Sequence, residues 1–192
     1  RTCNPKGFHL EYGFSCMGYE IAGGLSEKMA DPSREVYIMV GDGSYLMSSQ
    51  EMITAIQEGI KLTIILINNN GYASIGGLSA SLGTEGFGTK YKYRNPKTGL
   101  LNGANLPVDF AANAASMGAT VIKAGNITAL KSALEEAKKI TNTTVIYVES
   151  DLSHRVGGYA WWEVPVAQVS TSKKVREALA KLTKNKTTQK NY

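Results

Sequence analysis

The chain has 192 residues, 43% of them hydrophobic and 19% charged, a composition that excludes disordered and fibrous proteins. The formal net charge is +5, but residues 173–192 carry seven Lys or Arg and one acid, so the excess charge lies in a C-terminal tail rather than on a nucleic-acid-binding fold. Two cysteines do not make a disulfide framework, and no apolar run approaches the ~20 residues of a membrane span. We therefore expect a cytoplasmic protein that binds neither nucleic acid nor membrane.

The first third of the chain has the hydrophobic pattern of a helix followed by a β-α-β unit. Ile21, Leu25 and Met29 recur at four-residue spacing, which indicates one apolar stripe of a helix. Two uninterrupted apolar runs follow, as is typical of buried parallel strands. The expected elements are a helix over 17–30, a strand over 36–40, a helix over 48–58 and a strand over 62–67.

The rest of the chain begins with a long glycine-rich segment. Residues 68–106 contain eight glycines and no clear period, so we predict no regular structure there and expect part of loop 72–106 to be disordered in the isolated chain. Alternating elements follow, which together predict an α/β fold with a doubly wound parallel sheet. The expected elements are a helix over 108–117, a strand over 120–123, a helix over 128–139, a strand over 144–149 and a helix over 172–183. We expect one domain over 1–170 and a C-terminal helix with a basic tail over 171–192.

Polar residues follow two of the expected strands at the point where each strand ends. Gly41-Asp42-Gly43-Ser44 comes after the strand over 36–40, and Asn68-Asn69-Asn70-Gly71-Tyr72 comes after the strand over 62–67. Open parallel sheets bind ligands at the carboxyl ends of their strands. A carboxylate, a carboxamide and a backbone carbonyl turned inward at a glycine suit a hard divalent cation that holds a phosphorylated cofactor. The alternative is that Asp42 caps a helix and the asparagines are turn residues.

This pair of motifs, with 27 residues from Asp42 to Asn69, resembles the diphosphate-binding motif of the thiamine-diphosphate-dependent enzymes. The resemblance implies that thiamine diphosphate and Mg²⁺ are the cofactors. It also implies that the side chains of Asp42 and Asn69 and the carbonyl of Gly71 hold the metal. The cofactor-binding residues implied are Ser15, Cys16, Met17, Gly18, Gly41, Asp42, Gly43, Ser44, Asn69, Gly71, Tyr72 and Ala73.

A second segment, over 13–24, resembles the helix-opening segment of the same family's diphosphate-binding domains. In that family a bulky apolar side chain wedges under the cofactor, and Met17 occupies the matching position. Gly18 next to it would permit a close approach of the cofactor. The alternative interpretation of Met17 is an ordinary core methionine.

Three further segments, over 9–13, 71–78 and 161–166, resemble the branch of this family that acts in inositol catabolism. That branch would open the ring of trihydroxycyclohexane-1,2-dione, as a hydrolase that cleaves a C–C bond, to give 5-deoxyglucuronate. No catalytic residue is certain in this chain, but His9 and His154 are candidates for proton transfer. A 2-oxoacid decarboxylase or an acetolactate synthase-like carboligase is the alternative enzyme. A nucleotide-binding module is a further alternative, although the third glycine of its motif is absent after Gly43.

The resemblance also implies partners. In this family a Glu from a separate pyrimidine-binding domain activates the cofactor. The acids that precede the metal motif lie in no segment that resembles that domain. Because the chain begins without Met, we expect it to be part of a longer polypeptide. The resemblance implies that a missing N-terminal domain supplies the activating Glu, usually from another subunit of a homo-oligomer (dimer or tetramer). We therefore expect no turnover by the 192 residues alone. The acids concerned are Glu11, Glu20, Glu27, Asp31 and Glu35.

Overall fold

The computed structural model describes residues 5–11, 13–151 and 164–188. Its contacts divide the chain into two compact units. Residues 1–68 and 109–150 form what we call the sheet unit, and residues 69–108 and 151–192 form the loop unit. Each unit is described by itself.

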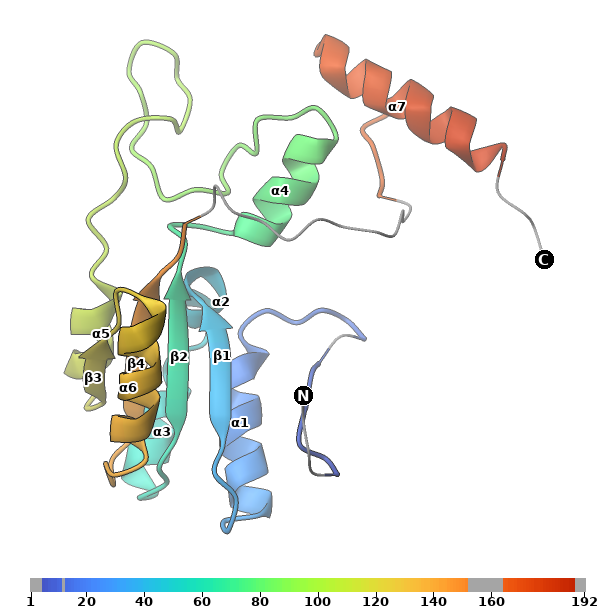
Figure 1. The fold of residues 1–192 in the computed structure, drawn as a ribbon. Helices are drawn as coiled ribbons and strands as arrows, with labels where there is room; N and C mark the ends of the chain where they lie inside the picture. Colours follow the sequence, from blue (N-terminus) through green and yellow to red (C-terminus); the bar gives the residue numbers. More distant parts are fainter. Residues whose placement is uncertain (1–4, 12, 152–163, 189–192) are drawn as a thin grey trace. The chain divides into compact units, whose positions relative to one another are not determined.

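The sheet unit contains a four-stranded sheet in which every pairing is parallel (Figure 1). The strand order β1-β2-β4-β3 confirms the parallel α/β fold expected from the sequence. Each strand lies within one residue of its predicted range, and the two apolar runs of the sequence correspond to β1 and β2. The strands are β1 (Tyr37–Gly41), β2 (Thr63–Asn68), β3 (Thr120–Lys123) and β4 (Thr144–Glu149).

Five helices of the described residues belong to the sheet unit, and four of them correspond to predicted helices with ends displaced by up to three residues. The helix over 42–47 was not predicted, because the motif that opens it contains two glycines, which favour a turn over a helix. The helices are α1 (Tyr19–Ala30), α2 (Asp42–Met47), α3 (Glu51–Gln57), α5 (Phe110–Ser116) and α6 (Ile127–Ala137).

The two faces of the sheet are covered to different extents. Ile38, Ile64 and Val145 are register partners on one face, and all three are buried. On the opposite face Ile146 is fully buried in a cluster with alanines of α6, whereas Met39 of β1 is 68% exposed. Within the described residues, α6 therefore covers the β4 side of this face and leaves the β1 side open.

The loop unit contains α4 (Ala73–Ser81) and α7 (Lys173–Lys186). The prediction of no regular structure over 68–106 is thus wrong for α4, whose apolar residues follow no helical stripe and whose residues are all at least partly exposed. The last predicted helix is confirmed as α7 and continues three residues beyond its expected end. No helix among the described residues is long and apolar enough to cross a membrane.

Candidate cofactor site

Asp42 stands at the carboxyl end of β1, where the strand gives way directly to α2. Its side chain is 0% exposed, and its Oδ1 accepts a hydrogen bond of 3.1 Å from the amide of Gly43. Gly41 pairs in register with Ile67, so β1 and β2 end at the same edge of the sheet. Asp42 is the first residue of α2 and Gly41 holds the N-cap position, so Asp42 does not cap this helix.

Asn68, the last residue of β2, is held by the neighbouring strand. Its Nδ2 donates to the hydroxyl of Tyr147 over 2.8 Å, and that hydroxyl lies 3.1 Å from Oε1 of Glu149, to which it donates. Burial raises the pKa of Tyr147 above its ordinary value. Sequence reasoning missed this interaction, because its partners are 79 residues apart. The Asn68 side chain thus joins β2 to β4. Asn69 is the first asparagine of the motif that lies beyond the end of β2.

In the loop unit, the backbone at Gly71 has a φ of 154° and lies against the segment around Lys90. A Cβ at Gly71 would stand 2.9 Å from the Cα of Lys90 and still closer to the carbonyl oxygen of Thr89. The amide of Tyr72 donates to that same carbonyl over 2.8 Å, and the amide of Tyr91 donates to the carbonyl of Asn70 over 3.0 Å. Only glycine fits this position without a clash.

The chemistry and the burial of the residues predicted to hold the metal can be compared with what Mg²⁺ requires. They offer one carboxylate oxygen, one carboxamide oxygen and one backbone carbonyl oxygen, the donor types that Mg²⁺ takes in proteins. The Asp42 side chain and the Oδ1 of Asn69 are both buried in their own units. In the part of the chain that the structure describes, no three His, Cys, Asp or Glu side chains form a rival metal cluster. Taken one by one, these donors are therefore of the kinds that fit a magnesium ion.

The segment before α1, which contains Met17, is shaped by two carboxylates. Glu11 accepts hydrogen bonds from the amides of Phe14 (3.1 Å) and Cys16 (2.8 Å), and Glu20 accepts one from the amide of Gly18 (2.9 Å). The bonds from Cys16 and Phe14 lower the pKa of the Glu11 carboxyl. Met17 is 36% exposed, so it is not an ordinary core methionine of the sheet unit.

His9, a candidate for proton transfer, lies against α1. Its Nε2 is 2.7 Å from the hydroxyl of Tyr19, and its Nδ1 is 3.6 Å from Oε1 of Glu27. It borders a cleft of about 710 Å³ between the N-terminal segment, α1 and β1, and Asp42 does not line this cleft. The structure therefore uses His9 to attach the N-terminal segment to α1. The other candidate, His154, lies outside the described residues, as do Trp161 and Trp162.

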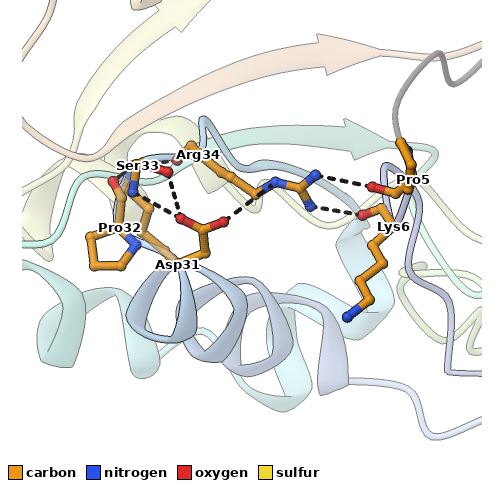
Figure 2. Close-up of polar contacts among 7 residues, drawn as sticks. Pro5, Lys6, Asp31, Pro32, Ser33 and Arg34 are labelled. Carbon is orange, nitrogen blue, oxygen red and sulfur yellow. Dashed lines mark hydrogen bonds and ion pairs between the residues drawn. The ribbon is translucent and has the colours of Figure 1, made fainter.

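The N-terminal segment is held at a second place by Arg34 (Figure 2). The Arg34 guanidinium donates to the carbonyls of Pro5 and Lys6 over 3.0 Å each. Its Nε lies 3.6 Å from Oδ2 of Asp31, whose Oδ1 accepts from the amide and the hydroxyl of Ser33. The hydrogen bonds from Ser33 lower the pKa of Asp31.

Comparison with known proteins gives a family match over most of the chain. Residues 1–148 match the family described as thiamine pyrophosphate enzyme, C-terminal TPP binding domain. A 3D-(3,5/4)-trihydroxycyclohexane-1,2-dione hydrolase 2 of Bacillus cereus is 45% identical over 91% of this chain. The corresponding hydrolase of Bacillus thuringiensis is 43% identical over the same share. The chain spans 27% of the length of each of these relatives.

A solved structure supports the fold. The thiamine diphosphate-dependent 4-hydroxybenzoylformate decarboxylase of Rhodococcus jostii superimposes with a TM-score of 0.56 over 70% of this chain and 23% of its own, at 24% identity. At this identity the likeness concerns the fold. The family match, the parallel sheet and the motif at its carboxyl edge agree. The chain belongs to the family of thiamine pyrophosphate enzymes, as a C-terminal TPP-binding domain.

Proposed function

We propose that this chain is the cofactor-binding part of a thiamine-diphosphate-dependent hydrolase that opens the ring of 3D-(3,5/4)-trihydroxycyclohexane-1,2-dione to 5-deoxyglucuronate. The observation that carries the proposal is the 43–45% identity, over 91% of the chain, to curated relatives named for this activity. The activity belongs to a longer polypeptide, because the chain corresponds to about a quarter of each relative. The 192 residues alone are expected to be inactive.

In this proposal, Asp42, Asn69 and the carbonyl of Gly71 hold Mg²⁺. The support for these donors comes from each unit by itself: Asp42 stands at the end of β1, and backbone hydrogen bonds join residues 70–72, around Gly71, to residues 89–91. Met17 supports the cofactor from the segment before α1. When bound, thiamine diphosphate supplies a nucleophilic carbon and accepts the electrons of the broken C–C bond. The remaining proposed contacts are Ser15, Cys16, Gly18, Gly41, Gly43, Ser44, Tyr72 and Ala73.

The activating Glu is proposed to lie outside this chain. A pyrimidine-binding domain supplies that Glu, and the enzyme works as a homo-oligomer. His9 already contacts Tyr19 and Glu27, so we assign it to attachment of the N-terminal segment and keep His154 as the candidate proton donor of this chain.

The test is an assay of a polypeptide that joins this chain to its pyrimidine-binding domain. With Mg²⁺ and thiamine diphosphate present, ring opening of the dione is measured beside pyruvate as a competing substrate. Turnover of the dione, lost in Asp42→Asn, is the expected result. Turnover of pyruvate alone would replace the proposal with a 2-oxoacid decarboxylase or an acetolactate synthase-like carboligase.

A further inference from the structure

We propose that Glu11 is a positioning residue for the cofactor: its carboxylate fixes the loop over 13–18 in the shape that presents Met17. The inference rests on the proposed cofactor-binding function and adds a residue to it. Glu11 lies outside the metal and diphosphate motifs.

The loop over 13–18 is held by hydrogen bonds from its backbone amides to carboxylates. Three alternate backbone amides, those of Phe14, Cys16 and Gly18, donate to carboxylates. Glu11 takes the first two, one on each oxygen, from the N-terminal side of the loop. Glu20 takes the third from the first turn of α1. Met17 therefore lies between two anchored amides.

The backbone of this loop has a positive φ at two positions, Ser15 and Gly18. Ser15 has a φ of 54°, a left-handed conformation that a residue with a side chain rarely adopts, and its two neighbours donate to Glu11. Such conformations persist where the surroundings enforce them. Gly18 has a φ of 95°, and a Cβ there would stand 3.2 Å from the Cβ atoms of both Met47 and Ser48. The loop thus bends at Ser15 and at Gly18, on either side of Met17.

An amide side chain cannot replace the carboxylate of Glu11. Both oxygens of an ionised carboxylate accept, whereas a glutamine offers one accepting oxygen and one donating nitrogen. Glu11→Gln keeps the size of the side chain but loses one bond to the loop and the charge that strengthens the other. If Glu11 sets the loop, this small change loosens Ser15 and Met17 together.

The experiment compares Glu11→Gln with Asp31→Asn. Asp31 also accepts a backbone amide and a hydroxyl, but it does so at the far end of α1. Hydrogen exchange of the Phe14 and Cys16 amides is measured in the 192-residue chain without cofactor. The dissociation constant of thiamine diphosphate is measured by calorimetry, at saturating Mg²⁺, in the polypeptide that includes the pyrimidine-binding domain.

We expect Glu11→Gln to accelerate exchange at both amides and to raise the dissociation constant roughly tenfold, as the loss of one charge-assisted hydrogen bond would. Asp31→Asn should change neither, and Glu11→Asp, which keeps the charge on a shorter side chain, should fall between wild type and Glu11→Gln. Unchanged exchange in a folded Glu11→Gln protein would overturn the loop-setting role. Accelerated exchange with unchanged affinity would overturn the role toward the cofactor. Failure of the wild-type protein to bind thiamine diphosphate would instead overturn the proposed function.

Discussion

The hydroxyl of Tyr19 lies 2.7 Å from Nε2 of His9, and this contact joins the N-terminal segment to the first turn of α1. The Tyr19 ring lies along its own helix over Gly23, where a Cβ would stand 2.6 Å from the ring carbon Cζ. Gly23 therefore leaves the space that lets Tyr19 reach His9. The segment that precedes the loop over 13–18 is thus attached to α1 through a tyrosine that a glycine accommodates.

Gly23→Ala should release the N-terminal segment, because the added methyl group displaces the Tyr19 ring. Hydrogen exchange over residues 8–11 should rise, as it should in Tyr19→Phe, which removes only the hydroxyl. The matched control is Ser26→Ala on the same helix, whose hydroxyl donates to the carbonyl of Ala22 one turn earlier. Equal exchange in Gly23→Ala and Ser26→Ala would show that the His9 contact does not hold the segment.

Gly71→Ala should damage the loop unit more than another glycine substitution with a positive φ. Both Gly71 and Gly88 have such a φ, but only at Gly71 would a Cβ collide with backbone, that of Thr89 and Lys90. Both variants carry conformational strain, of about 1–3 kcal/mol. The additional cost in Gly71→Ala should appear as weaker Mg²⁺-dependent binding of thiamine diphosphate, measured by calorimetry beside Gly88→Ala. Equal affinities in the two variants would contradict the assignment of Gly71 to the metal site.

Tyr45→Phe should change the alkaline limit of stability. Burial raises the pKa of the Tyr45 phenol to about 12, and its hydroxyl donates to Oδ1 of Asn113 over 2.7 Å. Because the folded-state pKa lies above the unfolded value of 10.0, Tyr45 contributes its full stability below pH 10 and loses it as the pH rises toward 12.

At neutral pH we expect Tyr45→Phe to lower the free energy of unfolding by about 1 kcal/mol, the value of one hydrogen bond. The difference from wild type should shrink above pH 10, measured by urea unfolding at a series of pH values. A difference that stays constant to pH 12 would mean that Tyr45 titrates like an exposed phenol.

Sequence patterns predicted the parallel sheet well because its signals are local. Apolar runs marked β1 and β2, and the end of the first run placed Asp42 at the carboxyl edge. The helices α2 and α4 were not predicted, because glycines in their sequences favour turns over helices. The motif that opens α2 has the composition of a turn, and Gly76 and Gly77 lie within α4.

The interactions around the candidate site were less accessible from sequence. The bond from Asn68 to Tyr147 joins residues 79 positions apart, and no local pattern signals it. The bonds from the loop to Glu11 depend on the left-handed backbone at Ser15, a conformation that its residue type does not favour. His9 was predicted as a proton-transfer group from its residue type and its position just before the segment over 13–24, whereas its neighbours Tyr19 and Glu27 give it a structural contact.

Asp42 is proposed to hold the metal that binds the cofactor. A calorimetric titration of thiamine diphosphate, with and without Mg²⁺, into the polypeptide that carries both domains tests this role. Asp42→Asn removes the charge from a fully buried side chain and keeps its size. The control, Asp109→Asn, removes a charge at the start of α5, where asparagine accepts the bond from the Ala112 amide equally well. We expect Mg²⁺-dependent binding of thiamine diphosphate that weakens roughly 100-fold in Asp42→Asn and is unchanged in Asp109→Asn. Binding of wild-type strength in Asp42→Asn would contradict this role.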